Sequence, residues 1–281
     1  MSQTAEDFIQ EARELPVMPP IAAEVMRKAE DPDTDLSSIA QLISSDASLA
    51  VRVLRIANSS FYSMPRKIET LQQSILLLGY STLRSVVIAA SMKDVFARFG
   101  LAERLLWEHA VAAAVATNML AREVGGLASD ELFIGGLVHD VGKLVMHSQD
   151  EPRYQEVMRE VYADNPDPID IEHKVFGFDH CEVGELVMHK WSLPTRLASA
   201  VGAHHNPEAI DDSEGAKTLA CVLQVADRIC IREGYGRRKP NPDLEPLECF
   251  GADFLGIKDM DLDSFVTQFR EAYETEKAIF G

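Results

Sequence analysis

The sequence has little of what marks a secreted or membrane-spanning protein. Its four cysteines form no Cys-x-x-Cys pair, which favours free thiols in a reducing compartment over a disulfide framework or a zinc–thiolate site. No apolar run comes near the roughly 18 residues that a membrane span requires. Residues 1–14 carry acidic side chains and no apolar segment typical of signal peptides. We therefore expect a cytoplasmic protein that does not enter a membrane.

Positive charge is also scarce. Lysine and arginine number 27 against 45 aspartates and glutamates, which gives a formal net charge of -18. A field of this sign repels phosphate backbones and anionic lipid surfaces at long range. The composition therefore argues against nucleic acid and against membranes as partners.

Strand-like alternation of apolar and polar residues is missing as well. Almost every segment instead repeats apolar residues at intervals of three and four, which is typical of amphipathic helices. We predict an all-α protein with an irregular multi-helix packing, because the helices are short and unevenly spaced. The predicted helices cover residues 21–26, 36–43, 46–58, 70–79, 81–99, 102–124, 130–147 with an interruption at 139–140, 151–164, 168–176, 180–190, 195–204, 214–233 and 261–280.

Histidine is absent from the first 108 residues, and all eight histidines lie between positions 109 and 205. This asymmetry divides the chain by function better than composition does. We predict an N-terminal helical subdomain (1–100), a helical subdomain that carries a metal site (101–240), and a linker with an amphipathic helix (241–281). The terminal helix is predicted to pack back on the domain, with a homodimer contact as the alternative.

Several histidines and aspartates fall on or beside apolar helical faces. His139 and Asp140 follow the apolar run 132–138, where an unpaired buried carboxylate would cost several kcal/mol. His109 lies three and four residues after two leucines and therefore shares their buried face. The same kind of setting surrounds four further residues, His180, His204, His205 and Asp227.

Imidazoles and carboxylates that converge from several helices form transition-metal sites. We therefore predict a site for one or two divalent ions of Fe, Mn, Ni or Zn. Its predicted ligands are His109, His139, Asp140, His180, His204, His205 and Asp227. The remaining histidines, His147, His173 and His189, lack this setting and are predicted to be surface or packing residues.

The order of these residues (His, then His-Asp, then Asp) resembles the HD superfamily of metal-dependent phosphohydrolases. The stretch Gly136–Leu144 (GLVHDVGKL) is similar to the HD-GYP and HDOD branches of that superfamily. The N-terminal half resembles the HDOD branch in four features, namely Leu15-Pro16 with Pro19, residues 36–46 leading into 54–59, Phe61-Tyr62, and residues 68–79. The resemblance covers about residues 10–235 and implies one HDOD domain with an HD-superfamily fold.

The resemblance implies two different functions, regulation and phosphodiester hydrolysis. HDOD domains are associated with bacterial signalling and regulation, so it implies action through regulatory protein partners. HD-GYP relatives hydrolyse cyclic di-GMP, and their ligand series corresponds to the seven predicted ligands. Their phosphate-contacting lysine corresponds to Lys143, which implies a nucleotide or phosphate ligand and catalytic roles for Asp140 and Lys143. Their Gly-Tyr-Pro loop, however, is replaced here by residues 206–210 (NPEAI).

We therefore predict a regulatory HDOD protein that contains a metal site and acts through protein partners. The alternative is a metal-dependent phosphohydrolase, a phosphodiesterase that could act on cyclic dinucleotides. In that alternative Asp140 bridges two ions, and Lys143 offsets phosphate charge. A third interpretation, that the histidines only pack the core, does not explain the carboxylates among them.

Overall fold

The computed structural model describes residues 3–12, 20–29, 34–59, 62, 66–96, 101–127, 129–164, 167–211, 215–237 and 239–280. These residues contain helices and no β-strand, which confirms the all-α prediction. In chain order the helices are α1 (Ala5–Glu11), α2 (Pro20–Ala29), α3 (Leu36–Ser44), α4 (Ala47–Ala57), α5 (Leu71–Phe96), α6 (Leu101–Val124), α7 (Ser129–Val138), α8 (Val141–Gln149), α9 (Glu151–Asp164), α10 (Pro168–Phe176), α11 (His180–Lys190), α12 (Thr195–Gly202), the 3-10 turn η1 (Pro207–Ala209), α13 (Ala216–Glu233), α14 (Phe250–Leu255) and α15 (Leu262–Phe280).

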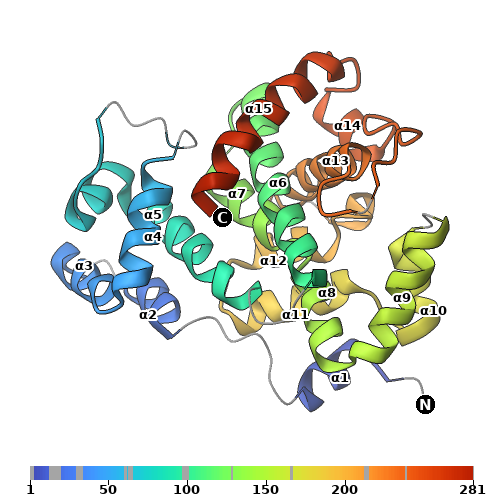
Figure 1. The fold of residues 1–281 in the computed structure, drawn as a ribbon, viewed down its shortest axis with the longest axis horizontal. Coiled ribbons are helices and arrows are strands. Elements are labelled where there is room, and N and C mark those ends of the chain that lie inside the picture. The colour runs from blue at the N-terminus through green and yellow to red at the C-terminus, as the bar shows by residue number, and fades with distance from the viewer. Residues whose placement is uncertain are drawn as a thin grey trace.

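The helices gather in two groups. Helices α2–α5 lie together on one side, α6–α14 form the larger body, and α15 runs beside α6 (Figure 1). Helix α1 packs on α11 of the larger body, where the ring of Phe8 lies 5.1 Å from that of Phe178. The predicted N-terminal subdomain thus includes a helix whose contacts lie in the second group. The division at residue 100 itself stays a prediction.

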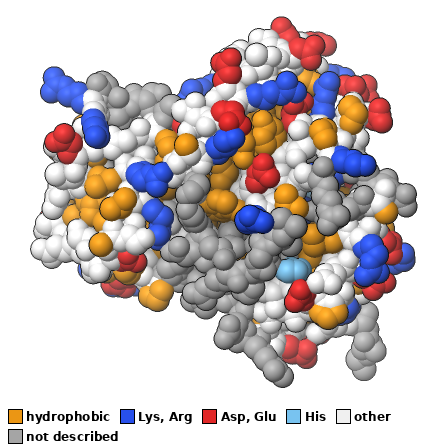
Figure 2. All heavy atoms as spheres, in the orientation of Figure 1, with side chains coloured by type: hydrophobic (Ala, Val, Ile, Leu, Met, Phe, Trp, Pro, Cys, Tyr) orange, Lys and Arg blue, Asp and Glu red, His pale blue; other side chains and the backbone are white. Residues whose placement is uncertain are grey.

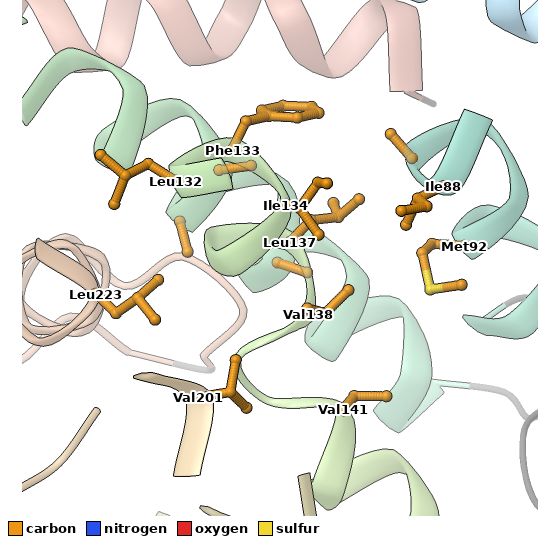
Figure 3. Close-up of a cluster of buried hydrophobic side chains, with 14 of the residues drawn as sticks. Ile88, Met92, Leu132, Phe133, Ile134, Leu137, Val138, Val141, Val201 and Leu223 are labelled. Atoms are coloured by element: carbon orange, nitrogen blue, oxygen red, sulfur yellow. The ribbon is translucent and has the colours of Figure 1, made fainter. Parts of the chain in front are cut away.

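A continuous apolar core joins the two groups. Figure 3 shows Ile88 and Met92 of α5 opposite Ile134, Leu137 and Val138 of α7. All five side chains are buried. Full burial of one aliphatic side chain of this size contributes about 1.5–3 kcal/mol, so this contact fixes α7 and the residues that follow it.

Local signals in the sequence explain several helix ends. The carboxylate of Asp46 accepts a hydrogen bond from the backbone N–H of Leu49 (3.0 Å), which caps α4. Within α5 the chain kinks at Gly79, whose φ of 79° is open to glycine without strain. The interruption expected at His139 and Asp140 is the turn that separates α7 from α8.

Helix α15 packs back on the domain, as predicted. Phe265, Phe269, Tyr273 and Phe280 are all buried, and the helix contacts α6 and α4. The homodimer alternative stays untested. Short α1 and α14 were not expected from periodicity. Part of the HDOD-like opening (Leu15, Pro16, Pro19 and Phe61) lies outside the described residues.

Among the described residues, no single helix is both long enough and apolar enough to cross a membrane. One bent pair within α5, Leu71–Tyr80 and Thr82–Met92, meets those criteria only when the two parts are taken together.

Candidate metal centre

The seven predicted ligands converge in the larger body although they come from five separate places in the sequence. His109 lies on α6, His139 and Asp140 in the turn after α7, and His180 begins α11. His204 and His205 follow α12, and Asp227 lies on α13. All are buried except the half-buried His205. Accordingly, hardly any histidine surface shows on the face drawn in Figure 2.

Two close helix contacts bring these elements together. A Cβ atom added to Gly136 of α7 would lie 2.7 Å from the backbone oxygen of Ala113 on α6. One added to Gly142 of α8 would lie 1.9 Å from the backbone oxygen of His180. Real Cβ contacts are never this short, so only glycine permits α7 to approach α6 and α8 to approach α11. The turn between α7 and α8 is thereby pressed against both partners.

The first group of ligand atoms surrounds one point. His109 Nε2 lies 2.9 Å from Asp227 Oδ1, 3.2 Å from His139 Nε2 and 3.6 Å from Asp140 Oδ2. His139 Nε2 lies 3.6 Å from the same Asp140 oxygen and 3.8 Å from Asp227 Oδ1. Atoms bound about 2.1 Å from one ion stand about 3–3.5 Å apart in common geometries. The four residues therefore fit the ligand set of a single transition-metal ion.

The second group lies around the other oxygen of the same aspartate. His180 Nε2 is 3.3 Å and His204 Nε2 is 3.8 Å from Asp140 Oδ1. The ring of His205 lies 4.4 Å from that of His204 and 5.1 Å from that of His180. Asp140 Oδ1, His204 Nε2 and His205 Nε2 are buried and make no hydrogen bond. Because such groups normally have a partner, their convergence fits a second cation.

In two of the histidines, the Nδ1 atom, which faces away from the centre, donates to a backbone oxygen of the preceding helix. His139 Nδ1 lies 2.8 Å from the backbone oxygen of Gly136, and His204 Nδ1 lies 2.7 Å from that of Val201. A carbonyl can only accept, so Nδ1 carries a proton, and Nε2 is the nitrogen that faces the centre and can bind a metal when the ring is neutral. Metal-binding histidines generally have this arrangement.

Two further histidines have Nδ1 partners, called anchors below, that lie in other segments of the chain. His180 Nδ1 lies 2.6 Å from Oε2 of Glu172 on α10, a fully buried carboxylate that also accepts the backbone N–H of His180 (2.9 Å). His109 Nδ1 lies 3.1 Å from the backbone oxygen of Tyr235, beyond α13. Sequence reasoning missed both. Glu172 offered the weak signal of an acid eight residues before a predicted ligand, and Tyr235 offered none.

A buried thiol was also missed. Cys181 Sγ lies 3.5 Å from His204 Nδ1 and 3.7 Å from His180 Nε2. Burial raises the pKa of this thiol. It therefore stands beside the second group as a neutral, polarizable neighbour.

The two carboxylates of the centre are ionised. Burial raises the pKa of a carboxyl group, but the charges of Lys143 and His139 outweigh burial and hold the pKa of Asp140 well below its usual value. For Asp227, hydrogen bonds from His109 and His139 likewise outweigh burial and keep the pKa well below its usual value. Two buried negative charges at one place favour a bound cation.

His204 and His205 are neutral. Burial and the neighbouring imidazole of His205 lower the pKa of His204 well below its usual value. Burial and the charge of His180 lower the pKa of His205 to about 4. Burial also opposes protonation of His139, but there the charge of Asp140 raises the pKa. A neutral imidazole is the form that binds a metal.

An open pocket leads to the centre. The centre of a water-sized molecule can reach about 80 Å³ of it, and its lining includes His109, Asp140 and Asp227. Lys143 and Arg237 supply positive charge, and Lys143 Nζ lies 2.7 Å from Asp140 Oδ2. Much of the wall is apolar and comes from α9, namely Tyr154, Val157, Met158 and Val161. Residues 206–210, which stand in place of the Gly-Tyr-Pro loop, do not line it.

The three histidines set aside in the sequence lie away from the ligand set. His147 is buried and its ring packs 5.6 Å from that of Tyr154. His173 and His189 are nearly half exposed and pair with Asp179 (3.0 Å) and Glu185 (3.8 Å). Their predicted surface or packing roles are confirmed.

Known proteins resemble this chain across most of its length. A family model, the HDOD domain, matches residues 15–207. An uncharacterized protein of Treponema pallidum (strain Nichols) is 26% identical over 196 residues, which is 69% of this chain and 38% of that protein. Ribonuclease Y of the same organism is 27% identical over 154 residues, or 53% of this chain and 24% of its own length. The chain thus spans well under half the length of these curated relatives.

Solved structures share the fold as well. An HDOD domain protein of unknown function from Geobacter sulfurreducens is 26% identical, covers 96% of each chain and superposes with a TM-score of 0.75. A "putative phosphohydrolase" from Shewanella amazonensis SB2B is 24% identical, covers 99% of this chain and 98% of that one, and gives a TM-score of 0.72, a likeness of fold alone. The match over residues 15–207 is the strongest of these findings, and by it the chain belongs to the HDOD family.

Proposed function

We propose that this HDOD protein is a metal-dependent phosphohydrolase whose centre holds two divalent transition-metal ions. The observation that carries the proposal is Asp140, whose two oxygens face two separate groups of ligand atoms. The unpartnered atoms of the second group and the fixed Nδ1 atoms of four histidines support it. The hydrolase alternative thereby moves ahead of the purely regulatory one.

The absent Gly-Tyr-Pro loop was the argument against hydrolysis. That argument weakens because residues 206–210 lie outside the pocket lining, and the pocket exists without their help. The loop's absence therefore bears on which phosphoester fits, and less on whether one fits.

The ligand groups divide between the two ions. One ion would be held by His109, His139, Asp227 and Asp140 Oδ2, and the other by His180, His204, His205 and Asp140 Oδ1. Mixed imidazole and carboxylate ligands suit Fe, Mn, Ni or Zn. Such ions supply Lewis-acid chemistry and activation of water.

Other side chains of the pocket would bind the phosphate and the organic part of the substrate. Lys143 keeps Asp140 ionised and presents an ammonium group, 14% exposed, to a phosphate in the pocket. Arg237 lines the same pocket. The apolar wall of α9 would receive the organic part of the ester and limit water near the reacting group.

The test separates binding from turnover. Protein purified without chelator should contain close to two transition-metal ions per chain. With added Mn or Fe it should hydrolyse bis(p-nitrophenyl) phosphate or a cyclic dinucleotide, and Asp140→Ala should not. Fully loaded protein that turns over no faster than Asp140→Ala would rule out the hydrolase.

A second candidate is the regulatory function expected from the sequence, with the metal centre as a structural element. Large apolar side chains are exposed on the contacting helices α4 and α5, namely Val51 (58%), Leu76 (74%) and Leu77 (53%). Large apolar side chains that stay exposed are candidate contacts for a protein partner. A crosslinker at position 76 should then capture a regulatory protein in bacterial cells, and Val51→Ser with Leu77→Ser should abolish capture.

A further inference from the structure

The anchors of the four inner histidines differ in how far they reach along the chain. His139 and His204 donate to carbonyls three residues earlier, and His180 donates to a carboxylate eight residues earlier. His109 depends on the carbonyl of Tyr235, 126 residues later. The orientation of His109 is therefore set by tertiary structure, and whatever holds Tyr235 in place also holds this ligand.

The loop that carries Tyr235 is pressed tightly against α6. Gly236 has a φ of 70°, and a Cβ atom there would lie 2.4 Å from the backbone oxygen of Leu105 and 2.5 Å from Cβ of His109. Only glycine allows this approach. The backbone N–H of Tyr235 donates to the carbonyl of Cys230 (3.0 Å), which directs its own carbonyl toward α6.

Helix α15 covers the side chain of Tyr235. The ring of Tyr235 lies 4.4 Å from that of Tyr273 and 5.2 Å from that of Phe269, both in edge-on geometry. Tyr273 is 5% exposed and Phe269 is fully buried. Aromatic pairs of this kind contribute beyond their buried area. The loop is thus held between α6 on one side and two rings of α15 on the other.

The far end of α15 is fixed on other helices. Arg55 of α4 donates to the backbone oxygen of Ala278 (2.7 Å), and the ring of Phe280 lies 5.8 Å from that of Phe133 on α7. The helix therefore contacts both α4 of the N-terminal group and the loop that carries Tyr235.

We propose that Tyr235, held by Phe269 and Tyr273 of the C-terminal helix, is a positioning residue for His109 and sets the affinity of the first ion site. The inference rests on the proposed metal centre and concerns only one of its two groups. Loss of the aromatic contacts lets the loop move away from α6. His109 then loses the acceptor that fixes its proton on Nδ1, while the other anchors stay in place.

The experiment uses a matched pair of variants in the full chain. Tyr273 and Phe280 both lie on α15, each is 5% exposed, and each loses one aromatic pair when changed to leucine. Zinc affinity is measured by competition with a chromophoric chelator. Tyr273→Leu should weaken one of two zinc ions on the order of 10- to 100-fold, as loss of an outer partner generally does. Phe280→Leu should leave both affinities unchanged.

A second pair keeps the inference testable if Tyr273→Leu does not fold. Tyr235→Phe retains the ring and the carbonyl and should bind zinc like the natural protein, whereas Tyr235→Ala should show the one-site loss. The zinc-loaded protein should also show a slowly exchanging Nδ1–H signal from His109, which Tyr235→Ala should broaden.

The outcomes separate this inference from the proposed function. Two unchanged zinc affinities in folded Tyr273→Leu and Tyr235→Ala would overturn the inference alone. Two zinc ions without turnover would overturn the hydrolase and leave the inference standing. A natural protein that binds no ion would overturn both.

Discussion

Helices α2–α5 and helices α6–α13 are built on the same apolar periodicity but bury different polar groups. Among the described side chains of α2–α5, the buried polar ones are serines of α5, such as Ser74, whose hydroxyl donates to the carbonyl of Leu71 (2.6 Å). Helices α6–α13 and the turns between them bury imidazoles and carboxylates, including His139, Asp140 and Glu172.

This difference separates structural from functional burial. A serine hydroxyl can donate to a partner on its own helix at little cost, as that of Ser74 does. A buried carboxylate costs several kcal/mol unless a cation or donors surround it. Helices α6–α13 therefore carry buried charges that packing alone would disfavour. Because these charges converge beside a pocket, they fit a functional site. If that is correct, substitutions in the two groups should change different measurable properties.

The largest expected effect is at Asp140. Asp140→Asn keeps the shape of the side chain but removes the charge that both ligand groups share, so both ions and all hydrolysis should be lost. Metal analysis and turnover of bis(p-nitrophenyl) phosphate measure this. Asp150→Asn at the end of α8 is the control and should retain both ions. An Asp140→Asn protein that still holds two ions would refute the shared-ligand geometry.

A core substitution in helices α2–α5 should lower the stability of the protein and leave its metal content unchanged. Ile39 of α3 is fully buried, and Ile39→Ala should lower the free energy of unfolding by about 2–5 kcal/mol through the lost contacts and the cavity left behind. Chemical denaturation measures this change. The metal content of the folded variant should equal that of the natural protein, and a lower content would erase the contrast between the two groups.

Adjacent glycines on α7 sharpen the comparison. Gly136→Ala drives a methyl group into the backbone of α6 and should cost about 1–3 kcal/mol, as overpacking does, with weaker binding at the His109 site. At Gly135 the nearest atoms are the flexible ends of Leu223 (3.2 Å) and Leu197 (3.3 Å). Gly135→Ala should therefore be near neutral or slightly stabilising. Equal effects at both positions would contradict the close helix contact.

The sequence signal for the seven candidate ligands is local. Each of the seven stands on or beside an apolar helical face, and the structure brings all of them to one place. The start of α4 at Asp46 and the break in α5 at Gly79 were predicted for the same reason, since a cap and a glycine with positive φ act over a few residues.

The remaining parts of the site depend on contacts between distant segments. Tyr235 acts through a backbone carbonyl, which any residue possesses, and the need for Gly236 arises only from the nearness of α6. Glu172 looks like a surface acid until α10 is packed against α11. Helices α1 and α14, with seven and six residues, are too short for periodicity to reveal.

The smallest predicted effect is at Glu172, where charge changes but shape does not. In Glu172→Gln the amide oxygen can still accept from His180 Nδ1 and from its backbone N–H, so folding should be preserved. His180 becomes a weaker ligand without the negative charge behind it, and the second ion should bind about 10-fold less tightly. Chelator competition measures this. Glu160→Gln, which removes a surface pair with Lys174 (2.9 Å), is the control and should leave both affinities unchanged. Glu172 contacts His180 of the second ion site, and Tyr235 contacts His109 of the first. Weakening of the His109 site in Glu172→Gln would therefore mean that the two ions do not bind independently.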